Sequence, residues 1–255
     1  MGQGGSSGSS GAMAGFSAGA GLTHKILKTA LAGPYPAGLE LVVFGTGCFW
    51  GSEKAFWKMP GVHTTAVGYA GGHTVNPTYE QTCSGSTGHT ECVQVVYDPK
   101  KVAFADLVSM FLQCHDPSQV NGQGNDHGTQ YRGAFYYTTP KQKQVGVAAM
   151  KKYEAQLGRK IATEVKPLDK FYFAEGYHQQ HLVGGRQYCS AQPQGIILAD
   201  AKEWMPAELL HDEAPKLSQK FWKKYAPSPH CVLKDPHTPF PVVAEDYATG
   251  VAPSL

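Results

Sequence analysis

The feature that most constrains the fold is an alternation, between residues 38 and 190, of short apolar runs with amphipathic stretches. Runs rich in Val, Ile and Tyr are typical of strands, whereas apolar residues three and four positions apart are typical of helices. The expected strands are 41–44, 62–70, 92–97, 131–138 and 161–165, and the expected helices are 49–58, 104–114 and 141–157. This order, with some strands joined as hairpins, predicts an α+β fold. We expect a two-layer sandwich with helices packed on a mixed, mainly antiparallel sheet.

Two long polar loops, 71–88 and 116–130, interrupt this pattern. Structureless loops of such length are uncommon in a compact domain, and loops held by a scaffold are where functional sites are usually built. We therefore expect the chemistry of the protein to lie in and around these two segments.

The segment before the alternation, residues 1–37, is expected to be flexible. Its run 5–11 contains only Gly and Ser and resembles an artificial linker. Two other interpretations stay open: Met1-Gly2 followed by Ser6 fits N-myristoylation at Gly2, and the absence of acidic residues before Glu40 suits an organelle transit peptide.

The segment after the alternation, residues 191–255, is expected to form a Pro-rich extension. Nine of the 17 Pro follow residue 190. Only residues 207–225 keep a composition that favours helix, and the remainder is expected to be extended and non-helical. The domains predicted are therefore a flexible segment 1–37, a catalytic domain 38–190 and the extension 191–255.

Composition excludes several classes of protein. A net charge of +2 does not suit a general nucleic-acid binder, and no apolar stretch approaches the length of a membrane span. The six Cys include no CxxC pair, so structural zinc is not expected. His178 and His181 have no Cys or carboxylate at ligand spacing, so we favour structural polar contacts over a metal site. No Gly-rich phosphate loop is placed to hold a nucleotide cofactor, and we expect no cofactor.

The sharpest local motif is Gly45-Thr46-Gly47-Cys48-Phe49-Trp50-Gly51. Here a Cys follows an expected buried strand and opens a helix. The free N–H groups and positive dipole end of a first helical turn stabilise a thiolate, which makes Cys48 a candidate nucleophile. The alternative is a buried Cys that fills space, with Phe49 and Trp50 packing in the core.

A candidate acid follows in Gly88-His89-Thr90-Glu91, where the first long loop meets the strand at 92–97. A carboxyl group beside apolar rings has a raised pKa and can donate a proton at neutral pH. The alternative is a solvated Glu at a strand start. Polar side chains are also dense in 124–132, and Tyr79 closes a turn in the first loop; the alternatives are an ordinary Asn/Asp turn and a half-buried loop anchor.

Together these motifs resemble the methionine sulfoxide reductase A family. The resemblance rests on seven motifs in one order, and later residues of the chain extend it. The seven are 47–51, 71–72, 76–79, 83–85, 88–91, 115–117 and 124–132, and the later residues are 173–175 and 177–180. The resemblance covers about residues 40 to 190 and implies a peptide-methionine (S)-S-oxide reductase acting on free or protein-bound S-sulfoxide.

The resemblance also implies a role for each site residue. Cys48 attacks the sulfoxide sulfur and becomes a sulfenic acid, while Glu91 protonates the departing oxygen. Tyr79 and Tyr131 hydrogen-bond that oxygen, and Asp126 orders a water in the pocket. The remaining two, Phe49 and Trp50, line an apolar cage for the substrate methyl. Elementary chemistry agrees, because sulfoxide oxygen leaves poorly unless it is protonated.

Recycling of the sulfenic acid is implied to use a resolving Cys and thioredoxin as reductant. Gln187-Tyr188-Cys189 matches the start of the family's recycling segment, so Cys189 is the first candidate. A common family form continues with a Gly-rich stretch and another Cys nearby. This chain reads Ser190-Ala191-Gln192-Pro193-Gln194 instead, and its next Cys, Cys231, is the second candidate.

Competing functions remain open from the sequence. A Cys peroxidase also passes through a sulfenic acid, but it needs a cation beside the thiolate, and 45–51 contains no Lys or Arg. A non-catalytic sulfoxide-binding module would not need both Cys48 and Glu91. We further expect a monomer located in the cytoplasm, with a plastid, a mitochondrion or a lipid-anchored membrane surface as alternatives.

Overall fold

The computed structural model describes residues 21–184, 192–198, 200–210, 214–225 and 235–247. A six-stranded sheet in the order β7-β6-β1-β3-β2-β8 forms the centre of the molecule. Neighbouring strands are antiparallel except β6 and β7, which are parallel. The strands are β1 (Glu40–Thr46), β2 (Val62–Ala70), β3 (Thr90–Tyr97), β6 (Gly133–Tyr137), β7 (Glu164–Pro167) and β8 (Phe171–Phe173). The predicted α+β class is confirmed.

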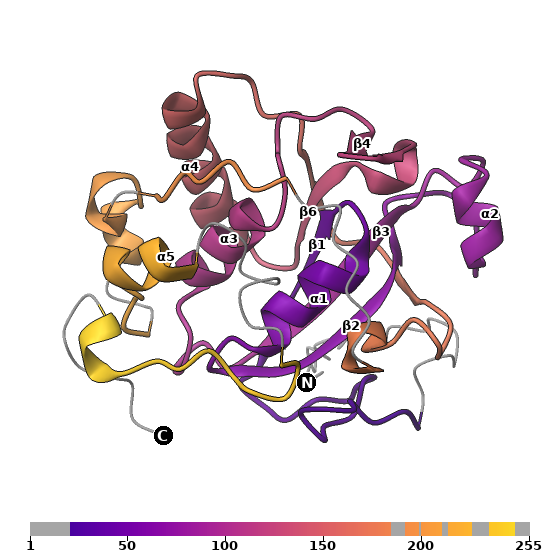
Figure 1. Cartoon of the computed structure of the whole chain (residues 1–255), viewed down its shortest axis with the longest axis horizontal. Coiled ribbons are helices and arrows are strands. Elements are labelled where there is room, and N and C mark those ends of the chain that lie inside the picture. Colours follow the sequence, from indigo (N-terminus) through magenta and orange to yellow (C-terminus); the bar gives the residue numbers. More distant parts are fainter. Residues whose placement is uncertain (1–20, 185–191, 199, 211–213, 226–234, 248–255) are drawn as a thin grey trace, which may run out of the picture.

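Helices cover one face of this sheet (Figure 1). The three long ones are α1 (Phe49–Trp57), α3 (Phe104–Gln113) and α4 (Pro140–Leu157). The period of two along β1 explains the layering. Phe44 points toward the helices and stacks on Phe56 of α1 at 5.3 Å and Phe111 of α3 at 4.8 Å between ring centroids. Its neighbour Val43 points to the other face, in a smaller apolar cluster with Leu31.

Both long loops contain short elements that the sequence does not predict. The first holds the five-residue helix α2 (Tyr79–Cys83), which Thr78 begins with a capping box. The second holds the hairpin of β4 (Gly122–Gln123) and β5 (Asp126–His127), followed by a 3₁₀ turn over Thr129–Tyr131. Strand β8 was also missed. Elements of two to five residues are too short to show a hydrophobic period, which is why the sequence indicates only loops here.

The expectation of flexibility as far as residue 37 does not hold for the described residues before β1. His24 and Leu31 are buried, and His24 Nε2 lies 2.9 Å from Thr65 Oγ1 of β2. Thr23 and Ala30 form a β-bridge that closes this segment into a short loop. Single buried residues without periodicity give no sequence signal, so the segment looks unstructured from its composition alone.

The Pro-rich extension packs on the helical layer (Figure 1). Helix α5 (Gln219–Tyr225) lies inside the stretch 207–225 that was expected to favour helix. Three further short turns are 3₁₀ helices: Ala201–Glu203, Ala207–Leu209 and Ala244–Asp246. The last of these lies in the part expected to be non-helical. Phe221 and Phe240 are buried in the same core as the sheet and helices, so the extension is part of the folded body.

Residues 235–240 of the extension bind the C-terminal end of α1. The Lys58 ammonium donates to the backbone carbonyls of Asp235 and Thr238, and the Phe240 N–H donates to the Lys58 carbonyl at 3.0 Å. The Trp57 indole N–H donates to the Pro236 carbonyl at 3.0 Å. The last carbonyls of a helix have no partner inside it, and the extension supplies one of the donors. In the described residues we find no helix of the length and apolarity that a bilayer crossing requires.

Candidate active site

Cys48 is the N-cap residue of α1, directly after β1. Gly47 makes the turn between them with φ of +84°, a backbone conformation that favours glycine. The residue as a whole is half-buried, and its thiol is largely surrounded by protein. Burial, the charge of Glu91 and the charge of Asp126 together raise the pKa of Cys48 well above its usual range, although a hydrogen bond from the Trp50 backbone N–H opposes them.

This direction corrects the expectation that the helix N-terminus holds a thiolate at rest. The dipole of a nine-residue helix acts on the sulfur, but desolvation and two carboxyl groups from distant segments outweigh it. Cys48 is therefore a neutral thiol in the free protein. Its proton must leave when a substrate binds.

Glu91 lies on β3, next to β1 in the sheet, and only 2% of it is exposed. Its Oε2 atom accepts a hydrogen bond of 3.1 Å from the Phe49 backbone N–H, one residue after Cys48. Burial, opposed by the hydrogen bond from the Phe49 N–H and assisted by the charge of Asp126, raises the pKa of Glu91 to about 8. At neutral pH this carboxyl group carries a proton beside the Cys48 thiol.

Two tyrosines and an aspartate from the two long loops complete the polar part of the site. Tyr79 opens α2, Tyr131 ends the 3₁₀ turn, and Asp126 opens β5. The hydroxyls of Tyr79 and Tyr131 are hydrogen-bonded to each other, and the pKa of each tyrosine is raised by burial and by the charge of Glu91. Each of the two long loops therefore contributes one tyrosine hydroxyl close enough to Glu91 to be influenced by its charge.

The apolar part of the site consists of Phe49 and Trp50 with a histidine that the sequence assigned only to polar contacts. Phe49 is 1% exposed, while Trp50 is half-buried. The Trp50 indole N–H donates to Nδ1 of His178 at 3.1 Å, and the His178 ring lies 5.2 Å from Phe49 and 4.6 Å from Tyr79. Burial lowers the pKa of His178 to about 4, so a neutral ring holds the indole in place.

Two buried or partly buried carboxylates were missed by sequence reasoning. Glu175 accepts hydrogen bonds of 2.9 Å from the Tyr79 backbone N–H and from the Tyr69 hydroxyl, which fixes the start of α2. Glu53 is fully buried in α1, where its carboxyl group accepts from the Gln180 backbone N–H at 2.9 Å. A signal for Glu53 was present, because it lies four positions after Phe49 and three before Phe56, on the apolar face of the helix.

The remaining cysteines differ in their surroundings. Cys92 and Cys114 are buried packing residues. Cys83 is half-buried and hydrogen-bonded to the Tyr79 hydroxyl, so it lies beside the site. Both candidate resolving residues, Cys189 and Cys231, lie outside the described residues. Within the described part of the chain, no group of three His, Cys, Asp or Glu side chains is arranged to hold a metal ion.

Known proteins resemble this chain over the whole of the site. A family model described as "Peptide methionine sulfoxide reductase" matches residues 40–207. The peptide methionine sulfoxide reductase MsrA of Salinispora arenicola is 51% identical over 180 residues, which cover 68% of this chain and 82% of that protein. The solved methionine sulfoxide reductase A of Corynebacterium diphtheriae is 42% identical with a TM-score of 0.59, covering 69% of this chain and 89% of its own. Reduced Mxr1 from Saccharomyces cerevisiae is 32% identical with a TM-score of 0.58, covering 62% of this chain and 93% of its own.

Proposed function

The chain belongs to the peptide methionine sulfoxide reductase family, and on that premise we propose that Cys48 attacks the sulfur of a methionine S-sulfoxide while Glu91 protonates its oxygen. The single observation that carries this assignment is the buried Glu91 carboxyl group, bound to the Phe49 N–H next to Cys48. A carboxyl group that stays neutral at pH 7 is a competent acid, and sulfoxide oxygen needs one.

The first step forms a bond between Cys48 Sγ and the sulfoxide sulfur. Glu91 gives its proton to the sulfoxide oxygen, and the thiol proton of Cys48 restores the protonated Glu91. Transfer of the resulting hydroxyl group to Cys48 then breaks the sulfur–sulfur bond. One thiol and one sulfoxide thus yield one sulfenic acid and one methionine, with the sulfoxide reduced and Cys48 oxidised by two electrons.

Tyr79 and Tyr131 are proposed to donate hydrogen bonds to the sulfoxide oxygen. Their contact with each other and the influence of Glu91 on both support this role. Because a polar oxygen and an apolar methyl are attached to the same sulfur, a site with donors on one side and rings on the other selects one epimer. Phe49 and Trp50 are proposed as the rings that hold the methyl group, and Asp126 as the residue that orders a water.

Recycling is proposed to proceed through Cys189 and then thioredoxin. Cys189 follows Gly184 by five positions, so the chain between them spans at most about 18 Å. The 3₁₀ turn that ends at Gly184 begins at His181, which stacks on Trp50 with ring centroids 4.1 Å apart. This anchor lies beside the N-terminal end of α1, where Cys48 lies.

Cys231 is proposed as the less favourable candidate, because the described residue nearest to it in the chain is bound at the other end of α1. It precedes Asp235 by four positions, and the Asp235 carbonyl is bound to Lys58 at the opposite end of α1. A helix of nine residues is about 14 Å long, and four residues span at most about 14 Å. Cys231 would therefore reach Cys48 only with the chain between it and Asp235 fully extended along α1, whereas Cys189 has slack. Mass mapping of disulfides after one stoichiometric turnover should find Cys48 joined to Cys189. A Cys48–Cys231 bond would reverse the order.

Three further properties concern the oligomeric state, the location and the form of the substrate. We propose that the protein acts as a monomer in the cytoplasm, on free or protein-bound sulfoxide. Myristoylation at Gly2 and an organelle transit peptide both concern residues outside the described ones, and mass analysis of the mature N-terminus in cells distinguishes them.

The test of the function uses dithiothreitol as reductant and resolved S- and R-sulfoxides of a blocked methionine. The parent protein should consume only the S-epimer, and Cys48→Ser should consume neither. Glu91→Gln should slow the single-turnover reaction by roughly a hundredfold, the usual scale of acid catalysis. Consumption of R alone would overturn the stereochemical assignment, and a parent rate in Glu91→Gln would overturn the role of the acid.

A further inference from the structure

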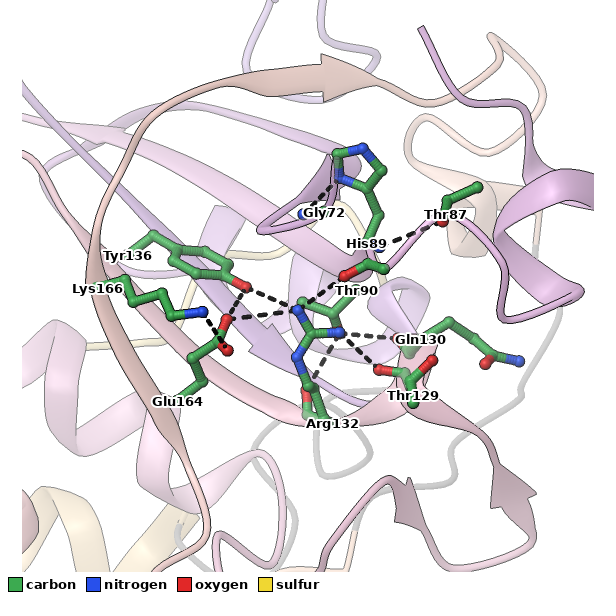
Figure 2. Close-up of polar contacts among 11 residues, drawn as sticks. Gly72, Thr87, His89, Thr90, Thr129, Gln130, Arg132, Tyr136, Glu164 and Lys166 are labelled. Carbon is green, nitrogen blue, oxygen red and sulfur yellow. Dashed lines mark hydrogen bonds and ion pairs between the residues drawn. The ribbon is translucent and has the colours of Figure 1, made fainter. Parts of the chain in front are cut away.

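The two segments that carry the proposed acid Glu91 and the proposed oxygen-binding residue Tyr131 meet at one side chain, that of Arg132 (Figure 2). We propose that Arg132 is a positioning residue, whose guanidinium sets the distance between the strand that carries Glu91 and the loop that carries Asp126 and Tyr131. This inference rests on the proposed function, because it concerns the geometry of the same reaction.

The guanidinium binds one backbone carbonyl from each segment. Its Nη1 atom donates to the Thr129 carbonyl at 2.9 Å, and its Nη2 atom donates to the Gly88 carbonyl at 3.0 Å. Gly88 precedes Glu91 by three residues, and Thr129 precedes Tyr131 by two. Gly88 and Thr129 are 41 positions apart in the chain, so the guanidinium joins two distant loops within a few residues of their functional side chains.

Thr90 reinforces this connection from the strand side. Its hydroxyl lies 2.8 Å from the Gln130 carbonyl and 3.2 Å from the Arg132 carbonyl. Successive side chains of a strand point to opposite faces, so Thr90 and Glu91 point away from each other. The connection thus lies behind Glu91, on the face opposite Cys48, and Arg132 has no part in the reacting site itself.

A fixed charge network holds the guanidinium in place. Glu164 of β7 lies 3.4 Å from Arg132 Nη2, accepts a bond of 2.6 Å from the Tyr136 hydroxyl, and pairs with Lys166 at 2.8 Å. Burial alone would raise the pKa of Glu164, but the bonds from Lys166 and Tyr136 and the Arg132 charge outweigh it and lower that pKa. Glu164 therefore stays ionised and balances a guanidinium that is only 15% exposed.

The space around the guanidinium suits a planar group. Gly71 has φ of +81°, and a Cβ atom there would lie 1.8 Å from the Tyr136 hydroxyl and 3.0 Å from Arg132 Nη2. The first long loop thus closes directly on the network. Arg presents donors in a rigid planar fork, whereas Lys presents one ammonium on a flexible stem, so Lys cannot reproduce two bonds to carbonyls on opposite sides.

The consequence for catalysis follows from the demands of the reaction. The sulfoxide oxygen has to meet the Glu91 proton and the Tyr131 hydroxyl at hydrogen-bond distance at the same time. A displacement of about 1 Å in such an arrangement costs on the order of a hundredfold in rate. Loosening the two loops also admits water to Glu91, which removes the desolvation that raises its pKa.

The test compares Arg132→Met, Arg132→Lys and Lys166→Met with the parent protein. Lys166 is 56% exposed and pairs with Glu164 without touching either of the two carbonyls that Arg132 binds, so Lys166→Met is the matched control. The measurement is the single-turnover rate of S-sulfoxide reduction, normalised to the methionine released per active protein, as a function of pH. Tyr79, Tyr131, Asp126 and Cys48 also face Glu91, and all are unchanged in these variants.

We expect Arg132→Met to lower the single-turnover rate about tenfold or more and to move the alkaline limb of its pH profile to lower pH. The rate of Arg132→Lys should lie between those of Arg132→Met and the parent. Lys166→Met should match the parent in both rate and pH profile. A change only in melting temperature, with the parent rate and pH limb, would overturn the inference. If Arg132→Met does not fold, a parent rate and pH limb in Arg132→Lys overturns it equally. A slow Glu91→Gln in the same series shows that the proposed function stands even where this inference fails.

Discussion

At the scale of single residues, the two proposed reacting groups, the Glu91 carboxyl group and the Cys48 thiol, each hold a proton before substrate binds. Glu91 and Cys48 are both protonated in the free protein because each is desolvated and the charge of Asp126 raises the pKa of both, while the charge of Glu91 further raises the pKa of Cys48. Groups coupled in this way titrate as a pair. The reaction therefore begins with a proton on both Cys48 and Glu91, and the sulfoxide oxygen is the group that takes up one of them.

The raised pKa of Glu91 predicts a pH-dependent contribution to stability. The folded-state pKa of about 8 lies above the ordinary value of 4.5, so the folded chain keeps a proton that the unfolded chain releases. Stability therefore falls as pH rises between about 4.5 and about 8. Glu91→Gln removes this loss, and its melting temperature should rise relative to the parent at pH 8 more than at pH 5.

The control for that measurement is Glu208→Gln, which changes an exposed carboxylate. It should shift the melting temperature equally little at both pH values. An equal shift in Glu91→Gln at pH 5 and pH 8 would contradict a raised pKa for Glu91.

His178 gives a second prediction at this scale. His178→Phe keeps the ring but removes the acceptor of the Trp50 indole N–H, while His178→Asn can retain an acceptor. Losing a buried hydrogen bond costs about 1–3 kcal/mol, so KM for the S-sulfoxide should rise roughly tenfold in His178→Phe and less in His178→Asn. Equal KM values in the two variants would show that the indole is held by packing alone.

At this scale the sequence indicates candidate residues where their chemistry is local, but not the contacts made by distant segments. Cys48 and Glu91 could be singled out as candidates, because each stands at the junction of an apolar run and a Gly-rich stretch. The pKa direction of Cys48 could not be predicted, since Glu91 and Asp126 reach it through β-pairing and loop packing. The roles of His178 and Glu175 depend on contacts across about 100 residues, for which spacing gives no signal.

At the scale of elements, short pieces do much of the positioning. The five residues of α2 would not form a helix alone, but the Thr78 cap and the Glu175 carboxylate hold its first turn. Long elements such as α3 were predictable from their period, whereas α2, β4, β5 and β8 were not. Apart from β8, the elements without a sequence signal are those that carry or adjoin Tyr79 and Asp126.

The capping box of α2 is open to a direct test. Thr78→Ala removes a side-chain acceptor whose loss costs about 1 kcal/mol, and it should loosen Tyr79 in the site. We expect a severalfold fall in the single-turnover rate with little change in global melting, while Thr78→Ser, which keeps the acceptor, stays near the parent. A parent rate in Thr78→Ala would mean that Glu175 alone fixes α2.

At the scale of the whole molecule, the extension and the segment before β1 complete the two layers. Leu31 covers part of the far face of the sheet, and Phe240 covers the helical side. The packing of these two residues could not be predicted, because a segment without hydrophobic periodicity does not indicate which surface it covers. The core of the domain, in contrast, follows from the alternation along β1 and β3.

The packing of the extension predicts a large effect of one substitution. Phe240 is 3% exposed and packs edge-on against Phe221 at 5.8 Å. Phe240→Ala should destabilise the protein by about 3–5 kcal/mol, measured by denaturant unfolding. Val243→Ala, at a position 57% exposed, should stay within about 0.5 kcal/mol. Equal effects of the two would show that the extension contributes little to the global fold.

The neutral thiol of Cys48 bears on survival under the conditions that create its substrate. Peroxides and electrophiles react with thiolates far faster than with protonated sulfur. A thiol that stays protonated until a sulfoxide binds reacts slowly with oxidants. It thereby avoids conversion to sulfinic acid, which cellular thiols do not reverse. The burial that keeps Cys48 protonated therefore protects the enzyme from inactivation by the same oxidants that produce its substrate.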